Sequence, residues 1–461
     1  MEAAETTDLR RGIPSLDRLL SDPAVSSLIP LYGRGPVRVQ ARREVDDLRE
    51  RLREQTTAGS APSAEEIESA VASLPGRIAA RIEAALGDSL TRVLNATGVL
   101  LHTNLGRAPL PRSVAAGLAP LLDAYCDLEL DVGTGKRGER NRRAERLLTA
   151  LTGAEAALAV NNNAAALVLA LAAHARGKEV VVSRGELVEI GGSFRIPEIL
   201  ATAGARLVEV GATNRTRLSD YEKAIGPETA LLLKVFPSNF RITGFTLSVS
   251  PQELAGLGRE KGLPVLVDEG SGLLRPRPEP QLADHPSMAE LIEAGCDLVC
   301  GSGDKLLGGP QTGLMVGRTD LVRACRKHPL YRAFRPDRMA FAALEGVLRL
   351  HLAGGALPLD RMWPDPAEHR ARLERAASEL PPDTAEIVPA EAFVGGGSAP
   401  EAPIPGEALS LPGDDALLAR LRQGEPAVVG YLRQGRLLLD LRTVDPEDDP
   451  ALIAAVRRSI G

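Results

Sequence analysis

Between about residue 90 and residue 355, short apolar runs rich in β-branched residues alternate with stretches of helical periodicity. The apolar runs are Ala156–Val160, Val180–Val182, Arg206–Val210, Ala230–Val235, Pro264–Val267, Leu298–Cys300 and Gly313–Val316. The helical stretches include Asn163–Ala173, Pro251–Lys261 and Met288–Glu293. Apolar strands separated by crossover helices predict an α/β fold with a parallel sheet covered on both faces. Ligands in such sheets bind at the carboxyl ends of the strands, so polar residues there are the first candidates for chemistry.

The 461 residues exceed what one core usually serves, and the pattern predicts three domains. Residues 1–85 are expected to be helical, 86–355 to form the large α/β domain, and 356–461 to form a small α+β domain. In the first domain, Ser63 and Glu66 have the spacing of a helix capping box. Acidic and basic residues nearly balance there, which favours a solvated helical domain over a dedicated RNA-binding surface. In the last domain, strand-like runs at 427–432 and 436–441 flank a turn at Gln434-Gly435.

Composition excludes several classes of protein. An apolar fraction of 44% with 25% charged residues is typical of a soluble globular chain. The longest apolar stretch, near Ala164–Ala173, is too short to span a bilayer, and the first residues lack the pattern of a secretory signal, so we expect a cytoplasmic protein without a membrane partner. A net charge of −6 argues against nonspecific coating of nucleic acid. The four cysteines have no metal-ligand spacing, and we expect no metal site.

Lys305 follows the run Leu298–Cys300 and lies where a strand would end. A lysine at that edge forms an imine with an aldehyde, provided that burial or a cationic neighbour keeps its amine deprotonated. Ser302, three residues earlier, is placed to donate its hydroxyl to a phosphate. The segment does not match a nucleotide P-loop, which needs Gly-Lys followed directly by Ser or Thr. Taken alone, Lys305 is equally compatible with a surface lysine.

Asp268 ends another apolar strand and precedes glycines in the segment Asp268–Gly272. A pyridine nitrogen stays protonated beside such a carboxylate, and protonation makes the ring an electron sink. The alternative is an ordinary helix N-cap.

Asn162, Asn163 and Ala164 lie where the strand Ala156–Val160 turns into an alanine-rich helix. Free amides at a helix N-terminus bind anions such as phosphate, although Asn-rich turns are also common caps. An anion site, a carboxylate and a lysine, in this order and each at a strand end, predict pyridoxal 5'-phosphate with Lys305 as its Schiff-base lysine.

The segment Gly133–Gly138 fits the glycine pattern of a dinucleotide-binding turn. The residues before it alternate with acids instead of forming a buried strand, and the residues after it are highly charged. We therefore reject nucleotide binding there and expect a loop at a subunit edge.

Three arginines complete the candidate set. Arg107 ends the run His102–Arg107, and Arg332 and Arg335 are spaced three apart, on one face if the segment is helical. Arginine binds phosphate-like anions with two parallel hydrogen bonds, whereas the alternative is ordinary surface ion pairing.

With these motifs in place, the chain resembles the bacterial selenocysteine synthases, the L-seryl-tRNA(Sec) selenium transferases, over essentially its whole length. The resemblance rests on Ile13–Asp17, Leu94–Val99, His102–Arg107, Val160–Ala164, Ser183–Gly192, Asp268–Gly272, Gly303–Gln311 and Leu438–Thr443. It implies the aspartate-aminotransferase-like fold of fold type I pyridoxal-phosphate enzymes, with Lys305 as the cofactor lysine. It also implies an N-terminal domain that engages tRNA and homo-oligomers built from dimers. Arg107, Arg332 and Arg335 are expected to line the selenium-donor pocket, and Arg107 could reach in from a neighbouring subunit.

The implied reaction converts seryl-tRNA(Sec) to selenocysteinyl-tRNA(Sec), with a dehydroalanyl intermediate on the cofactor and selenophosphate as donor. One alternative is a related pyridoxal-phosphate lyase acting on a small amino acid or amino sugar acid, which would be expected to lack a full N-terminal helical domain. Another is a noncatalytic tRNA-binding scaffold, against which the Asp268–Lys305 pair argues.

Overall fold

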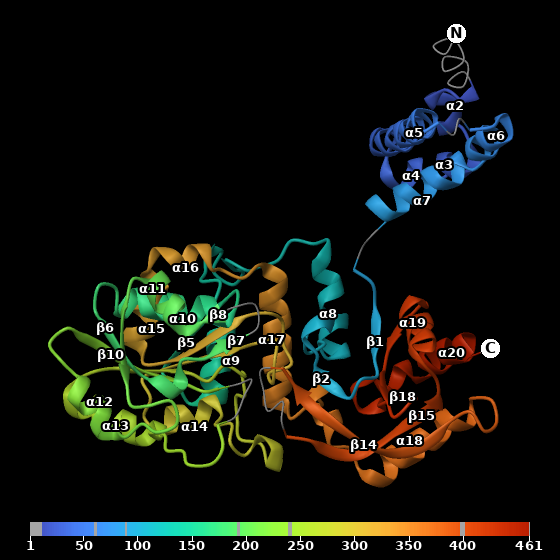
Figure 1. Cartoon of the computed structure of the whole chain (residues 1–461). Coiled ribbons are helices and arrows are strands. Elements are labelled where there is room, and N and C mark those ends of the chain that lie inside the picture. Colours follow the sequence, from blue (N-terminus) through green and yellow to red (C-terminus); the bar gives the residue numbers. More distant parts are fainter. Residues whose placement is uncertain are drawn as a thin grey trace. The chain divides into compact units, whose positions relative to one another are not determined.

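A computed structural model of the chain describes residues 12–59, 62–87, 90–190, 194–237, 242–396 and 402–460. Gly191 and Gly192 of the resemblance motif lie outside these residues. The chain divides into two compact units, Met1–Arg92 and Val93–Gly461 (Figure 1).

The N-terminal unit is helical, as the sequence predicts. Its helices are α2 (Leu16–Leu20), α3 (Pro23–Ser26), α4 (Ile29–Tyr32), α5 (Arg34–Thr57), α6 (Ala64–Ala72) and α7 (Leu74–Leu86). Leu74, Ile78 and Ile82 recur every four residues along α7, which places them on one face, and all three are fully buried. The predicted capping box is present, because the Ser63 hydroxyl accepts from the Glu66 amide and the Glu66 carboxylate accepts from the Ser63 amide.

The second unit contains the expected large sheet, with seven strands in the order β5-β13-β12-β11-β10-β6-β9. The strands are β5 (Ala156–Val160), β6 (Glu179–Ser183), β9 (Arg206–Val210), β10 (Thr229–Val235), β11 (Val265–Asp268), β12 (Leu298–Ser302) and β13 (Gly313–Gly317). Each falls on a predicted apolar run. Strands β12, β11, β10, β6 and β9 are parallel to their neighbours in that order, so their carboxyl ends meet at one edge.

Strand β13 is antiparallel to both β12 and β5, which corrects the expectation of an all-parallel sheet. Only the segment 303–312 separates β12 from β13. A parallel return needs a crossover of about a dozen residues or more, so this shorter connection reverses the chain directly. The connection carries Lys305 and holds it at the edge where β12 ends.

Helices cover both faces of the sheet. One face packs against α9 (Arg142–Thr152), α12 (Leu218–Ala224), α13 (Pro251–Lys261), α14 (Met288–Glu293) and α17 (Arg338–Ala353). The other packs against α10 (Asn163–His174), α11 (Ile196–Ala203), α15 (Thr319–Lys327) and α16 (Pro329–Ala333) (Figure 1). Successive strand residues point to opposite faces, so Ala157 and Ala159 enter one core while Leu158 and Val160 enter the other.

The C-terminal part of this unit has a five-stranded sheet in the order β17-β18-β15-β14-β2 and a separate β1-β16 pair. Its strands are β1 (Val93–Asn95), β2 (Val99–Leu101), β14 (Glu386–Gly395), β15 (Ile404–Pro412), β16 (Ala427–Val429), β17 (Tyr431–Arg433) and β18 (Arg436–Leu439). Its helices are α18 (Pro366–Ser378), α19 (Asp415–Gln423) and α20 (Asp449–Ile460). The segment 93–101 thus pairs with C-terminal strands. The turn Gln434-Gly435 is confirmed, with both residues at positive φ, whereas the run 427–432 is divided between β16 and β17.

The remaining elements are α8 (Arg112–Leu122) and two short hairpins, β3 (Leu130–Asp131) with β4 (Lys136–Arg137) and β7 (Glu189–Ile190) with β8 (Phe194–Arg195). The segment Gly133–Gly138 lies in the turn and second strand of the β3-β4 hairpin, which is separate from the seven-stranded sheet. Across the described ranges, no helix is both long enough and apolar enough to cross a membrane.

Candidate active site

Lys305 lies in the turn after β12 and is 7% exposed. Its Nζ donates to the carbonyl oxygen of Gly270 over 3.1 Å. Burial lowers the pKa of the Lys305 amine, and the positive charge of Arg107 acts in the same direction, while Asp268 and Glu269 oppose both. A buried amine with a lowered pKa has a larger neutral, nucleophilic fraction than a surface lysine.

Asp268 ends β11 and is buried beside this lysine. Its Oδ1 accepts from Asn163 Nδ2 over 2.8 Å. Burial raises the pKa of Asp268, and the Asn163 hydrogen bond and the charge of Lys305 act against that rise. The structure therefore joins two of the sequence candidates by a direct hydrogen bond.

The N-terminus of α10 forms the third side of the site. Asn162 is its N-cap, and its Oδ1 accepts from the Ala165 amide over 2.8 Å. Asn163 Oδ1 is buried and has no hydrogen-bond partner among the described residues. An unpaired buried acceptor is costly unless a ligand donates to it, so this atom fits a site built for a ligand. Ala164 follows in the first turn.

A close approach of two turns fixes the position of Lys305. Gly272 has φ +75°, and a Cβ on it would lie 1.9 Å from the Ser302 carbonyl oxygen. Only glycine permits both the conformation and the contact. Ser302 is buried at the end of β12, three residues before Lys305.

Arg107 lies beside Lys305 in the same chain. Its guanidinium forms an ion pair with Asp304, and the Ala108 amide donates to the Asp304 carbonyl over 3.4 Å. Arg107 also has φ +65°, a conformation that non-glycine residues adopt at a cost. Within this one chain, Arg107 is thus already at the site, without a neighbouring subunit.

Arg332 and Arg335 lie at a different part of the same edge. Arg332 is exposed in α16, which ends at Ala333, so the two arginines are not on one helix. The Phe334 carbonyl accepts from the Asn161 amide over 2.9 Å, which brings this segment to the end of β5. The Arg335 guanidinium lies 5.3 Å from the ring centroid of Tyr331. No contact between either guanidinium and Lys305 is seen among the described residues.

Glu269 is a site residue that sequence reasoning missed. It is buried next to Asp268, and its carboxylate accepts from the Ser271 hydroxyl and from the Gly272 amide over 2.6 Å. Burial raises the pKa of Glu269 to about 7, against the lowering effect of these hydrogen bonds. The sequence signal that could have identified Glu269 was its position directly after Asp268 in the segment Asp268–Gly272. However, a second acidic residue after a strand is usually exposed.

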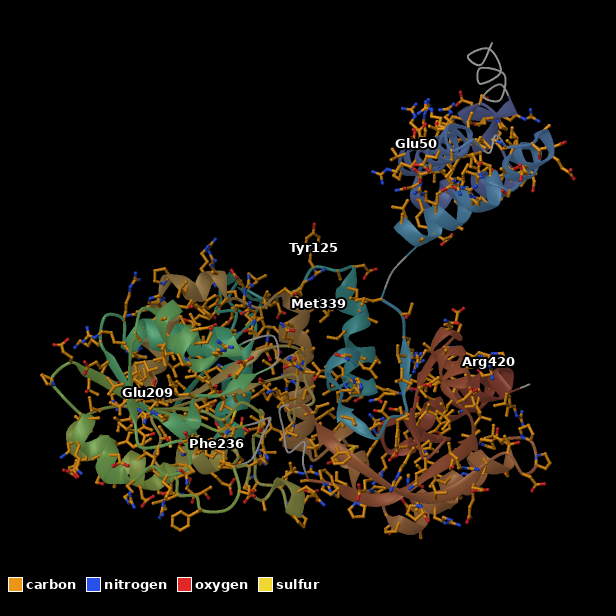
Figure 2. The ribbon with its side chains drawn as sticks, in the orientation of Figure 1. Glu50, Tyr125, Glu209, Phe236, Met339 and Arg420 are labelled. Atoms are coloured by element: carbon orange, nitrogen blue, oxygen red, sulfur yellow. The ribbon has the colours of Figure 1, made fainter. Side chains whose placement is uncertain are left out.

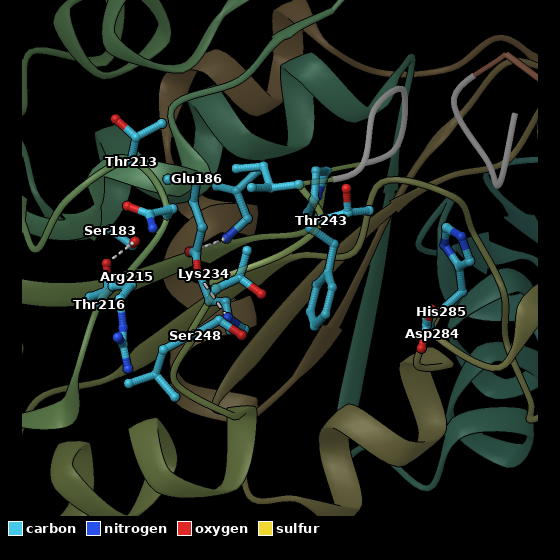
Figure 3. A pocket seen from close by; sticks show the side chains of 18 of the residues that line it. Ser183, Glu186, Thr213, Arg215, Thr216, Lys234, Thr243, Ser248, Asp284 and His285 are labelled. Atoms are coloured by element: carbon cyan, nitrogen blue, oxygen red, sulfur yellow. Dashed lines mark hydrogen bonds and ion pairs between the residues drawn. The ribbon is translucent and has the colours of Figure 1, made fainter. Parts of the chain in front are cut away.

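A cavity of about 600 Å³ opens next to this edge, at the ends of β6, β9 and β10 (Figure 3). Within it, the buried Lys234 donates from Nζ to Glu186 over 2.8 Å, and Glu186 also accepts from the Val235 amide over 3.0 Å. In Figure 3, Arg215 and Thr216 lie on one side of this pair and Asp284 and His285 on the other. The sequence analysis predicted no site at this position.

Comparisons with known proteins show which family the chain is similar to. The family profile described as L-seryl-tRNA selenium transferase matches residues 93–445, and one described as selenocysteine synthase N terminal matches residues 10–49. The L-seryl-tRNA(Sec) selenium transferase of Hyphomonas neptunium is 44% identical, over 98% of this chain and 99% of that protein. The transferase of Geobacter sulfurreducens is 45% identical, over 96% of this chain and 98% of that protein. The transferase of Moorella thermoacetica is 42% identical, over 99% of this chain and 98% of that protein.

Among solved structures, a D-glucosaminate-6-phosphate ammonia-lyase superimposes with a TM-score of 0.58 at 22% identity, over 82% of this chain and 97% of that one. This likeness concerns the fold, and it agrees with the predicted fold type I architecture.

Proposed function

The chain belongs to the L-seryl-tRNA selenium transferase family, and from that membership we propose that it converts L-seryl-tRNA(Sec) into L-selenocysteinyl-tRNA(Sec). The observation that carries the proposal is identity of 42–45% to transferases over 96–99% of the chain. Residues 10–49 match the selenocysteine synthase N-terminal profile. This match favours the transferase over a lyase, because a lyase acting on a small amino acid does not need a helical N-terminal domain.

The cofactor of this reaction is pyridoxal 5'-phosphate, and the site has the groups that would hold it. Lys305 would bind its aldehyde, Asp268 its ring nitrogen, and the N-terminus of α10 at Asn162, Asn163 and Ala164 its phosphate, with Ser302 as a further hydroxyl donor. When bound, the cofactor supplies an electron-withdrawing ring that stabilises negative charge at the substrate Cα.

The residues of the chain then divide the proton chemistry between them. Lys305 Nζ, with its lowered pKa, accepts the proton from Cα of the seryl group. Asp268 holds the proton of the ring nitrogen, and the Asn163 amide orients the carboxylate for this task. The buried surroundings exclude water, which would otherwise compete for the reacting β-carbon.

We assign selenium delivery to the three arginines, with selenophosphate as donor. The support is chemical, since arginine recognises phosphate-like anions, and positional, since Arg107 is held by Asp304 next to Lys305 and the Arg335 segment adjoins Asn161. The β-hydroxyl of the seryl group leaves as water. The selenium of selenophosphate forms the new bond to the β-carbon, and the P–Se bond breaks as the phosphoryl group passes to water and leaves as inorganic phosphate.

For the wider assembly, the proposal has three domains, 1–85, 86–355 and 356–461, with the first engaging the tRNA. We also propose a homo-oligomer built from dimers, working in the cytoplasm where tRNA is charged. Four large apolar residues on the segment 122–132 are exposed, which suits a subunit interface: Leu122, Tyr125, Leu130 and Val132. Figure 2 shows Tyr125 projecting away from the ribbon.

The proposal is tested with the purified holoenzyme, seryl-tRNA(Sec) and selenophosphate. Wild type is expected to form selenocysteinyl-tRNA, and Lys305→Ala to lose both the reaction and the visible absorbance of the lysine-bound cofactor. Borohydride reduction followed by peptide mapping checks the position. A label on Lys234, or a colourless wild-type protein, would contradict the assignment.

The donor arm of the same experiment uses Arg332→Ala and Arg335→Ala. Both variants should keep the cofactor absorbance and the loss of the seryl hydroxyl, while selenium transfer falls. Equal loss of the elimination step in these variants would remove the two arginines from donor binding.

A further inference from the structure

Arg215 lines the cavity next to the active site, and its guanidinium is stacked on an aromatic ring. Its guanidinium stacks on the Phe245 ring, with 4.2 Å between Cζ and the ring centroid. Its Nε is buried and has no hydrogen-bond partner among the described residues. Since Phe245 covers one face of the guanidinium, the opposite face is the one left for a ligand.

Hydrogen bonds join the backbone segment that carries Arg215 to the segment that carries Phe245. The Leu247 amide donates to the Asn214 carbonyl and the Thr216 amide to the Leu247 carbonyl, each over 2.9 Å. Asn214 Nδ2 donates to the Phe245 carbonyl over 2.7 Å. Two loops that lie thirty residues apart in the sequence thus form one wall, and the stacked pair is preorganised for a flat partner.

The cavity adjoins the carboxylate that the cofactor requires. Its wall includes Val235 and Phe236. Val235 is the register partner of Asp268 on the next strand, and the Phe236 amide donates to the Asp268 carbonyl over 3.0 Å. A group bonded to a substrate that reacts near Lys305 therefore has this cavity beside it.

The lining of the cavity suits a flat, largely neutral ligand. The Lys234 ammonium is paired with the Glu186 carboxylate, and Asp284 lies beside His285 across the cavity from Arg215 (Figure 3). Hydroxyl groups of Thr213, Thr243, Thr246 and Ser248 line the remaining wall. A volume of about 600 Å³ is in the range of pockets for small organic ligands.

We propose that this cavity binds the 3′-terminal adenosine of the tRNA, with the adenine base stacked on Arg215. This rests on the proposed function, because a seryl group esterified to a ribose hydroxyl brings the terminal nucleoside to within a few bonds of the reacting carbon. Stacking on a guanidinium plane is a common way for proteins to hold unpaired bases.

The test compares two hydrolysis-stable probes, an amide of L-serine with 3′-amino-3′-deoxyadenosine and the same amide of the abasic sugar. Binding of both to the holoenzyme is measured by titration calorimetry. Wild type should prefer the adenosine probe by roughly 5- to 150-fold, which corresponds to the free energy of about 1–3 kcal/mol found for stacking of one base. Arg215→Ala should lose this preference and keep its affinity for the abasic probe.

Two further variants make the test specific. Arg215→Lys keeps the positive charge but lacks the planar guanidinium, so it should also lose the preference for the adenosine probe. Arg217→Ala is the matched control, because Arg217 is exposed and outside the cavity wall, and it should behave as wild type. If Arg215→Lys retains the preference, or if Arg215→Ala binds both probes as wild type does, the assignment is wrong.

Cofactor absorbance shows whether each variant is folded. If Arg215→Ala proves unstable, Phe245→Leu, a change at an exposed ring, should still reduce the preference, and an unchanged preference there would overturn the proposal. Failure of wild type to convert seryl-tRNA(Sec) would instead count against the proposed function, whichever probe it prefers.

Discussion

Two buried lysines lie at the same edge of the large sheet, and their surroundings separate their roles. Lys234 donates from Nζ to the Glu186 carboxylate over 2.8 Å. Lys305 donates to a backbone carbonyl, and burial lowers the pKa of its amine. Burial of Lys305 favours the neutral amine that imine formation needs. At the scale of single residues, burial therefore prepares Lys305 for this chemistry.

Glu269 yields a prediction about stability and pH. Its pKa is raised from 4.5 to about 7, so between these values the folded state holds a proton that the unfolded state has released. Stability therefore falls as pH rises from about 4.5 to about 7, by an amount of the order of 3 kcal/mol. Glu269→Gln should remove this decline, which is measured as the difference between wild-type and variant denaturation midpoints at pH 5 and pH 8.

Glu260→Gln is the control for this prediction, because Glu260 is exposed on α13 and its surface ion pair with Lys261 contributes little, so the variant should keep the wild-type decline with pH. A Glu269→Gln variant whose midpoint follows that of wild type at both pH values would show that Glu269 ionises normally.

At the scale of elements, two turns position the residues that we propose to hold the cofactor. The turn after β11 carries Glu269 to Gly272, and the turn after β12 carries Lys305. The two turns meet at Gly272, where the Ser302 carbonyl oxygen occupies the space that a side chain would need. The antiparallel return to β13 closes the second turn, so backbone geometry positions Lys305.

Gly272→Ala tests this contact. The new Cβ would clash with the Ser302 carbonyl oxygen, and alanine would also be strained by the positive φ of this position. We therefore expect the free energy of unfolding to fall by roughly 2–3 kcal/mol and Lys305 to be displaced. Denaturant unfolding and cofactor absorbance measure the two effects. The matched control is Gly256→Ala in α13, where a Cβ meets nothing within 4 Å, and helix propensity should give a gain of up to about 1 kcal/mol. Equal stability of the two variants would refute the role of the contact.

At the scale of the whole molecule, residues 1–92 form a unit with its own core of apolar side chains from α2, α3, α5 and α7. Such a unit can be removed without opening the core of the rest. The remaining unit, 93–461, contains every residue of the candidate active site.

Deleting residues 1–92 should therefore leave the cofactor absorbance intact and weaken binding of seryl-tRNA(Sec) by roughly tenfold or more, if phosphate contacts of the helical unit are lost. Filter binding at a stated salt concentration measures the affinity, and binding of L-serinamide, which has no RNA part, is the control. An unchanged affinity for the tRNA would exclude the N-terminal unit from its recognition.

The sequence by itself determined the strands of the large sheet, the capping box at Ser63 and the order of Asn163, Asp268 and Lys305 at the strand ends. These features follow from periodicity and from short-range hydrogen bonding, which neighbouring residues in the chain encode. Tertiary structure alone decided the direction of β13, the ion pair of Arg107 with Asp304, the raised pKa of Glu269 and the stacking of Arg215 on Phe245. Each of these depends on burial or on contacts between segments far apart in the chain, and local pattern carries no information about either.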